Sequence, residues 1–329
     1  MPHFSTCPST VPDYYAIVLH TIAGISIPMN LLGFYLIFYQ SKKMKGYKYC
    51  LCYLQFSSFI SELDMSIACP GYYFFPMIAG YNLGIEFIRA HYCMTFYLFM
   101  FAFELPSALL CFIFRNNAAE EIRMRIPGKM YLKKVSLFLC HLFPFAVAVS
   151  FGKADLTYQQ KYFILRTKWP ECIEWIKAGN FEIYDYNLNP WLAVAGIGAV
   201  SMVLVVYTYC FYLSISTMRI LQNFQKSMSA QTYQMHKTAL LSLLMQLLLP
   251  GILIIIPLCI YMFVVVTEAI HLQEFATNTQ FMIASHSMCS CLVMIFSNPN
   301  YRKCLKTKIF SSFGYLLKDW RFTKKTKIS

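Results

Sequence analysis

Seven apolar stretches, each about long enough to cross a bilayer, divide this chain, and most Lys and Arg residues fall in alternate gaps between them. A bilayer core about 30 Å thick requires about 20 mainly apolar helical residues, because a backbone in lipid must satisfy its own hydrogen bonds. The pattern therefore predicts an all-α, seven-transmembrane helix bundle. The expected spans lie near residues 15–39, 49–78, 91–114, 135–151, 190–217, 238–267 and 277–297.

The composition leaves room for one membrane domain. Of the 329 residues, 58% are hydrophobic and 13% are charged, which is too little polar sequence for a separate soluble domain. We expect a transmembrane domain over residues 1–297 and a basic cytoplasmic tail over residues 298–329. Apolar side chains are interspersed with lysines in this tail, as in an amphipathic helix that lies in the membrane interface.

The charge of the gaps predicts the orientation. The gaps at 40–48, 115–134 and 218–237, together with the tail, hold 22 of the 28 Lys and Arg residues. Basic residues close to span ends are retained on the cytoplasmic side. We therefore expect the N-terminus outside and the C-terminus inside. The net charge of +13 then reflects topology and attraction to anionic membrane lipid, and it predicts no nucleic-acid partner.

Four of the 13 cysteines reach the outer side in this topology: Cys7, Cys69, Cys93 and Cys172. Disulfides form in oxidising compartments, and four cysteines allow three pairings. We favour Cys93 with Cys172, because that bridge would hold the long outer loop across the mouth of the bundle, and Cys7 with Cys69. Free buried thiols are the alternative for both pairs. The other cysteines lack partners at zinc spacing, so no metal site or other cofactor is expected.

Seven helices, an outer N-terminus, a cysteine at the start of the third helix and another in the next outer loop resemble the plan of G-protein-coupled receptors. Shorter segments are similar to the serpentine chemoreceptors of nematodes, with class I closest and class H second. These segments are Cys7-Pro8, Gly24-Ile25-Ser26-Ile27, Tyr35-Leu36-Ile37, Pro70, Pro76, Ala79-Gly80 and Pro299 with Tyr301-Arg302. The resemblance implies olfactory-type reception of a small-molecule chemical at the plasma membrane of sensory-neuron cilia. It also implies coupling to a heterotrimeric G protein.

Two motifs depart from the best-known receptor pattern. The third helix ends in Phe114, Arg115 and Asn116, with no acidic residue before the arginine. The sequence Asn298-Pro299-Asn300-Tyr301 is one residue shorter than the usual Asn-Pro-x-x-Tyr. The resemblance therefore does not extend to the standard activation switch.

Three acidic residues fall within the expected spans: Glu62, Asp64 and Glu104. Ionisable groups in a membrane are costly and are functional candidates by default. We expect an interior polar network in which Asp64 and Glu104 link ligand entry to helix rearrangement. Neutral acids that are hydrogen-bonded for packing are the alternative. His20 and His286 are assigned to helix packing.

Aromatic and Met side chains in the outer half of the bundle predict a mainly apolar ligand pocket with few polar anchors. The candidates are Phe96, Phe99, Met100, Phe103, Tyr261, Met262 and Phe281. Packing or lipid contact is the alternative role for each. On the inner side, a cleft for a helix of the G protein is expected. The alternative is that the basic residues there only set the orientation of the chain in the membrane. The residues expected there are Arg115, Arg219, Tyr301 and Arg302.

Other function classes are less well supported. The chain has no Walker loop, dinucleotide fingerprint, H-E-x-x-H or G-x-S-x-G motif, so no enzyme is expected. A secondary transporter using the intramembrane carboxylates is an alternative, although no internal repeat divides the seven spans. A ligand-gated channel of the insect odorant-receptor type would place its N-terminus inside, contrary to the loop charges.

Overall fold

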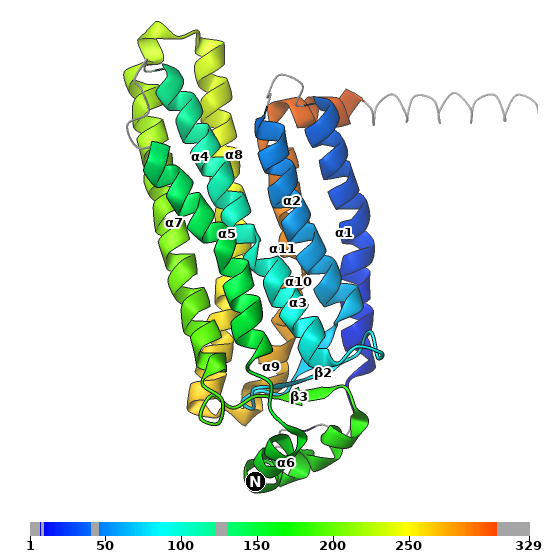
Figure 1. The fold of residues 1–329 in the computed structure, drawn as a ribbon. Coiled ribbons are helices and arrows are strands. Elements are labelled where there is room, and N and C mark those ends of the chain that lie inside the picture. The colour runs from blue at the N-terminus through cyan, green and yellow to red at the C-terminus, as the bar shows by residue number, and fades with distance from the viewer. Residues whose placement is uncertain (1–6, 8–9, 41–45, 123–129, 308–329) are drawn as a thin grey trace, which may run out of the picture.

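A computed structural model describes residue 7 and residues 10–40, 46–122 and 130–307. In these residues the chain is mostly helical, and long helices lie side by side with a small sheet at one end (Figure 1). The long helices are α1 (Asp13–Gln40), α2 (Tyr47–Leu63), α3 (Ala90–Ala102), α4 (Glu104–Ile122), α5 (Met130–Gly152), α7 (Trp191–Asn223), α8 (Ala230–Thr267) and α11 (His286–Ser297). Short helices α9 (Gln273–Asn278) and α10 (Gln280–Ala284) precede α11.

In the described part of the chain, five helical segments are long and apolar enough to cross a membrane. They are α1, the consecutive helices α3 and α4, α5, α7 and α8. A sixth candidate is the segment Ile270–Ala284 with α11, which bend by 42° at their junction. Helix α2 has 17 residues and is shorter than these candidates. The prediction of a multi-pass helical bundle is thus confirmed at this level.

The second expected span, 49–78, is too long. Helix α2 is followed by a π-helical turn, η1 (Asp64–Ala68), and the backbone amide of Cys69 closes this turn on the Asp64 carbonyl. Pro70 comes next, and a proline disfavours the helical conformation in the residue before it and offers no amide hydrogen. The apolar run therefore leaves the helix here, and strand β1 (Gly71–Tyr73) follows within it.

Three short strands correct the expectation of an all-α fold. They are β1 (Gly71–Tyr73), β2 (Ala79–Asn82) and β3 (Phe181–Ile183), in the order β1-β2-β3 with antiparallel neighbours. Tyr72 is opposite Tyr81, and Gly80 is opposite Glu182. The long loop between α5 and α7 thus adds β3 to the hairpin of β1 and β2.

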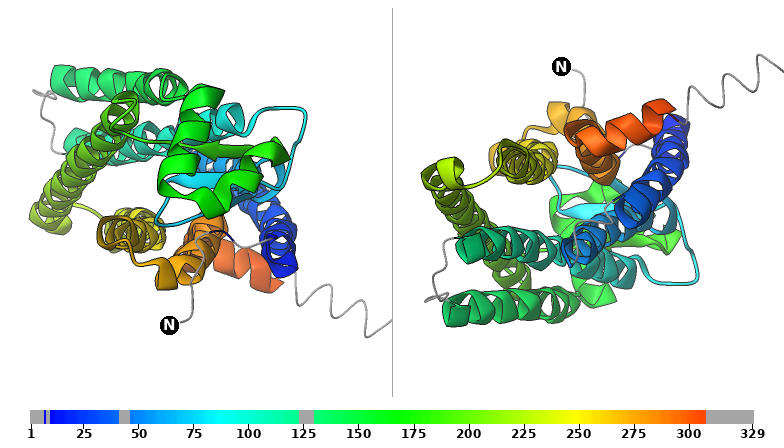
Figure 2. Two further views of the ribbon diagram at one scale, coloured as in Figure 1. Left: turned by 90° about the horizontal axis from the view of Figure 1, so that it is seen from below. Right: turned by 90° about the horizontal axis from the view of Figure 1, so that it is seen from above.

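The sheet and the rest of the long loop cover one end of the bundle. Seen along the bundle from below, the sheet and α6 (Tyr158–Lys168) lie over the ends of the long helices (Figure 2). Thr157 begins α6 with a capping box, in which its side chain and that of Gln160 bond reciprocally to backbone amides. A 3-10 helix, η2 (Pro170–Ala178), leads from α6 to β3. We call the sheet, α6 and η2 the cap.

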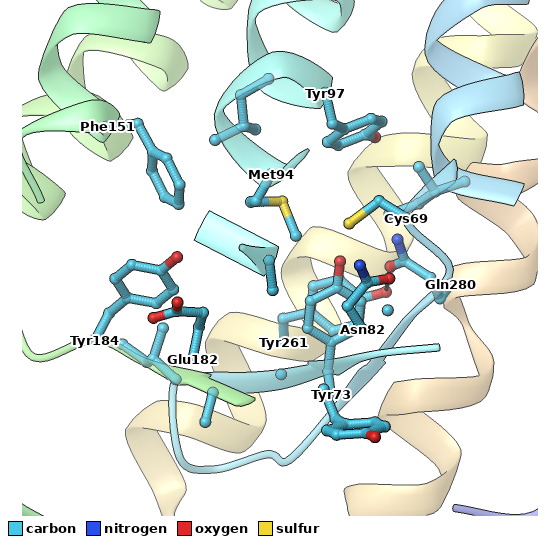
Figure 3. A pocket seen from close by; sticks show the side chains of 18 of the residues that line it. Cys69, Tyr73, Asn82, Met94, Tyr97, Phe151, Glu182, Tyr184, Tyr261 and Gln280 are labelled. Atoms are coloured by element: carbon cyan, nitrogen blue, oxygen red, sulfur yellow. Dashed lines mark hydrogen bonds between the residues drawn. The ribbon is translucent and has the colours of Figure 1, made fainter. Parts of the chain in front are cut away.

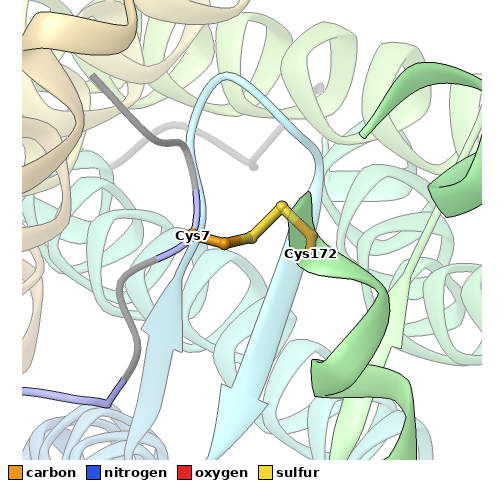
Figure 4. Close-up of a disulfide and its surroundings, with 2 residues drawn as sticks. All are labelled: Cys7 and Cys172. Carbon is orange, nitrogen blue, oxygen red and sulfur yellow. A yellow bond between two sulfur atoms is a disulfide. The ribbon is translucent and has the colours of Figure 1, made fainter. Parts of the chain in front are cut away.

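A disulfide joins Cys7 to Cys172 in η2, with 5.3 Å between their Cα atoms (Figure 4). This corrects the expected pairs of Cys93 with Cys172 and Cys7 with Cys69. The physical reason is the sheet, which holds η2 against the N-terminal segment in one apolar cluster that includes both bridged cysteines. Cys93 lies instead in α3 next to Cys69.

Two apolar cores are separated along the bundle by a polar layer. One core lies towards the cap and includes Tyr15, Tyr97 and Ile283, and the other includes Phe112 and Ile295 at the opposite end. Between them, four helices contribute polar side chains that are buried or nearly so. This polar layer consists of Ser26, Asn30, Gln55, Ser61, Glu62, Glu104, His286 and Ser287.

The expected cytoplasmic tail is described only at its start. After a break at Asn298, residues 299–307 are helical and run across the end of the bundle opposite the cap (Figure 1). Residues 308–329 lie outside the described residues, so the amphipathic pattern of the tail stays a prediction. The Lys and Arg residues within 41–45 and 123–129 also lie outside the described residues.

Candidate functional site

A cavity of about 380 Å³ lies between the cap and the helices (Figure 3). Its floor on the cap side is the sheet, and its walls come from Cys69 and from α3, α5, α7, α8 and α10. Most lining side chains are aromatic or aliphatic, a composition typical of sites for small organic molecules. The larger ones are Tyr73, Phe75, Tyr81, Met94, Tyr97, Leu98, Phe101, Phe151, Tyr184, Leu192, Ile254, Leu258, Tyr261 and Ile283.

Uncharged hydrogen-bonding groups occupy one side of the cavity. Tyr261 donates from its hydroxyl to Oε1 of Gln280 at 2.7 Å, and Nε2 of Gln280 lies 3.1 Å from Sδ of Met65. Asn82 also lines the cavity (Figure 3), and its amide donates to the carbonyl of Ile85 and accepts from the amide of Gly84. An amide keeps both donor and acceptor capacity, so Gln280 and Asn82 are suited to hold a polar group of a bound molecule.

The carboxylate of Glu182 lines the cavity, and two basic side chains neutralise its charge. Lys161 of α6 forms a buried ion pair with it, and Nη2 of Arg89 lies 3.1 Å from its Oε1. Lys161 also reaches Asp155 at 3.1 Å. Buried charges are tolerated when they are paired in this way. The cluster therefore fastens α6 to β3 and leaves no unbalanced charge at this wall.

His91 orients Tyr184 at the cavity wall. Its Nε2 is 3.2 Å from the carbonyl of Gly152, and its Nδ1 is 3.0 Å from the Tyr184 hydroxyl. A carbonyl can only accept, so Nε2 of the ring donates to Gly152. In the neutral ring Nδ1 then accepts from Tyr184. This contact fixes the direction of the Tyr184 hydroxyl.

Stability of the cap is expected to fall only in acid. Burial alone would raise the pKa of Asp155, but the hydrogen bond and charge of Lys161 hold it below the ordinary value of 3.8. The Lys168 pair has the same net effect on the pKa of Asp185. A carboxylate with a lowered folded-state pKa stabilises the fold above its unfolded pKa, and this contribution is lost as the pH falls through the folded-state value.

Hydrogen exchange of α6, corrected for intrinsic rates, should therefore be unchanged from about pH 7 to about pH 5 and faster below about pH 3.8. Asp155→Asn removes one of the two titrating groups and should weaken the acid response. Faster exchange that begins near neutral pH would assign the titration to another group.

A buried imidazole and carboxylate form the centre of the polar layer. Nε2 of His286 is 2.8 Å from Oε1 of Glu104, and Nδ1 is 2.6 Å from the carbonyl of Ile283. Nδ1 must donate to that carbonyl, so a single proton lies in the bond between Nε2 and Glu104 whichever partner holds it. Ser61 donates to the same Glu104 oxygen at 2.8 Å. Helices α2, α4 and α11 therefore meet at Glu104.

The layer continues from Glu104 to α1. Glu62 of α2 accepts a bond from the backbone amide of Met288 at 2.9 Å and is hydrogen-bonded to Ser26. Asn30 donates to Ser26 Oγ at 2.8 Å and accepts from Ser287 and Gln55. These contacts join four helices through groups that can exchange hydrogen-bond partners.

The comparisons with known proteins agree with this architecture. A family model described as serpentine type 7TM GPCR chemoreceptor Sri matches residues 5–305. The chain belongs to this family of receptors. The prediction of serpentine receptor class I is confirmed, and so is the prediction that the protein is no enzyme. A search of curated protein sequences found no match.

In this Sri receptor, Tyr261 is the expected pocket residue that lines the cavity. Phe99 and Phe103 pack edge to face on Phe145 of α5. Phe281 packs on Tyr15 at 5.0 Å. Phe96 and Met262 are 48% and 63% exposed on their helices, and the lining of the cavity does not include them or Met100.

The acidic residues of the receptor are divided between two places. Glu62 and Glu104 belong to the polar layer, as expected for an interior network. Asp64 lies in η1 near Cys69 and Cys93, and in the described part of the chain no hydrogen bond joins it to Glu104. The expected link between Asp64 and Glu104 is therefore corrected, and His286 takes that place.

At the end opposite the cap, the expected G-protein residues differ in accessibility. Arg115 is buried with its guanidinium 3.6 Å from the centre of the Tyr47 ring, and Tyr301 is buried in the apolar core of that end. Arg219 and Arg302 are exposed. The cavity residues contributed by β1, β2 and β3 were not among the expected pocket residues, since alternation over three or four residues is too short a signal.

Proposed function

We propose that the receptor detects a small, uncharged, mainly apolar organic molecule in the cavity beneath the cap and signals to a heterotrimeric G protein. The observation that carries this proposal is the cavity itself. It is lined mainly by aromatic and aliphatic side chains, with polar groups gathered at Gln280 and Asn82. A volume of about 380 Å³ lies in the usual range for drug-sized ligands.

The preference for an uncharged ligand follows from the charges at the wall. Glu182 is the one Asp or Glu among the lining residues, and Lys161 and Arg89 already neutralise it. An ionic ligand would be moved from water into an apolar site without an opposite charge to receive it, which is costly. A ligand with one hydrogen-bonding group can instead bind to Gln280.

The orientation supports a cavity that faces the outside of the cell. Loop charges favour an outside N-terminus, and the cap carries the Cys7–Cys172 disulfide, which is typical of an oxidising compartment. The end opposite the cap then faces the cytoplasm at the plasma membrane, with sensory-neuron cilia as the proposed site.

Transmission to the inner side is proposed to pass through the polar layer. Ile283 belongs to the cavity wall and its carbonyl accepts the bond from His286, which in turn contacts Glu104. Movement of α10 against a ligand therefore changes the contacts that join α2, α4 and α11. Exposure of Arg115 and Tyr301 beside Arg219 and Arg302 would then complete the G-protein surface.

The deciding experiment is a calcium and second-messenger recording in cells that express the receptor at the surface. The cells are screened with uncharged volatile and water-soluble compounds, with and without a G-protein α subunit. A response that requires the subunit is expected. A ligand-driven current or uptake that persists without it would overturn the proposal in favour of a channel or transporter.

Filling the cavity should abolish the response. Met94→Trp adds bulk to a side chain that projects into the cavity (Figure 3), so we expect at least a tenfold loss of ligand potency. Phe96→Trp, two residues away on the exposed face of α3, is the matched control and should leave potency unchanged. Surface labelling verifies equal expression. Equal potency of both variants would place the ligand elsewhere.

A further inference from the structure

Cys69 and Cys93 lie as neighbouring free thiols at the capped end of the bundle. Cys69 directly follows η1 and Cys93 lies in the first turns of α3, and the two thiols are close neighbours. Both are buried, at 5% and 6% exposure. Four outer cysteines allow three pairings. The pairing that joins Cys7 to Cys172 leaves Cys69 and Cys93 as the second pair.

The compartment distinguishes this pair from other neighbouring cysteines of the receptor. Cys69 and Cys93 lie beneath the cap, at the same end of the bundle as the Cys7–Cys172 disulfide. Cys50 and Cys111 are also buried and close to each other, but they belong to the inner core. Thiols persist on the cytoplasmic side, whereas adjacent thiols that mature in an oxidising compartment become disulfides.

We propose that Cys69 and Cys93 are joined in the mature receptor by a second disulfide. The inference rests on the proposed orientation, with the cap outside. The bridge would close residues 69–93 into a loop that contains the β1-β2 hairpin. Because Gly71, Tyr73 and residues 79–82 of that loop line the cavity, the bridge would hold the cavity floor against α3.

The reaction is a thiol–disulfide exchange with a protein disulfide of the secretory pathway as the oxidant. One thiolate attacks the donor disulfide and releases a donor thiol, and the second thiolate then displaces the other donor sulfur. One S–S bond forms in the receptor and one breaks in the donor. The two electrons and two protons lost by Cys69 and Cys93 convert the donor disulfide to a dithiol. Because both sulfurs are buried, exchange must precede packing of the hairpin.

Peptide mapping of the full-length receptor from cell membranes tests the bridge. The protein is denatured directly in a maleimide, so that every free thiol is trapped, and is digested without reduction. The expected result is a linked peptide pair that contains Cys69 and Cys93, lighter by two hydrogen atoms than the free peptides, beside the linked Cys7 and Cys172 peptides. Cys50 and Cys111 should carry maleimide and serve as the internal control.

A variant provides a second readout. Cys93→Ser should make Cys69 fully reactive with maleimide while Cys7 and Cys172 stay linked, and Cys111→Ser should leave Cys69 unreactive. Maleimide on both Cys69 and Cys93 of the unmodified receptor, or a link from Cys93 to Cys172, would overturn the proposal. If the unmodified receptor lacks the bridge but signals through the G protein, this inference alone is refuted. If the bridge is present but signalling does not need the G protein, the proposed function alone is refuted.

Discussion

Replacing Glu104 with leucine is expected to destabilise the receptor by about 3–5 kcal/mol, because the change leaves a buried imidazole without its carboxylate partner. His286 is 1% exposed, and its Nε2 has Glu104 at 2.8 Å. The change also removes the acceptor of the Ser61 hydroxyl. Thermal unfolding of the purified receptor and surface labelling of cells should both show the loss.

The double variant Glu104→Leu/His286→Leu separates pairing from packing. Replacing both members of a buried pair with apolar residues is often neutral, whereas breaking the pair is costly. We therefore expect the double variant to be more stable than either single variant, although its ligand response should be lost if the pair transmits the signal. A double variant whose loss equals the sum of the two single losses would show that Glu104 and His286 are not coupled.

Glu62→Gln is the matched control for these variants. An amide oxygen can still accept the bond from the Met288 backbone, so stability should change by less than about 1 kcal/mol. A loss as large as that of Glu104→Leu would instead show that Glu62 needs its charge or its proton.

Replacing Cys7 with serine is expected to cost about 2–5 kcal/mol, since the bridge to Cys172 closes a loop of most of the first half of the chain. A single covalent bond is lost in each case, so Cys7→Ser, Cys172→Ser and the double variant should have the same unfolding midpoint. A serine at position 7 with no effect, beside a large effect of Cys172→Ser, would contradict this pairing.

The long helices were predictable because an apolar run of membrane length has few alternatives to a transmembrane helix. Helices α1, α5, α7 and α8 contain or closely match their expected spans. The second span was overestimated since apolar content alone does not distinguish helix from strand. Pro70 and Pro76 were visible signals of the break, but the pairing of β2 with β3 joins segments about 100 residues apart and leaves no local pattern.

The candidate site was less predictable for two physical reasons. Aromatic residues are frequent on both the lipid-facing and the inward sides of these helices, so type alone did not separate Phe96 from Tyr97. Glu104 was expected to form a network with Asp64, whereas the structure supplies His286 from a helix far away in the chain. The pairing of the four cysteines expected on the outer side could not be predicted, because it depends on the sheet.

The separation of two apolar cores by the polar layer has a mechanical consequence. Interdigitated apolar side chains resist sliding because every shift opens voids. Hydroxyl, amide and imidazole groups can change partners at little net cost, because each broken hydrogen bond is replaced. Shear between the capped half of the bundle and the opposite half should therefore concentrate at Asn30, Glu104 and His286. The capped half and the opposite half would each move as a rigid body and slide against each other at the polar layer. The number of alternative hydrogen-bond partners in this layer would set how many discrete relative positions the two halves can occupy.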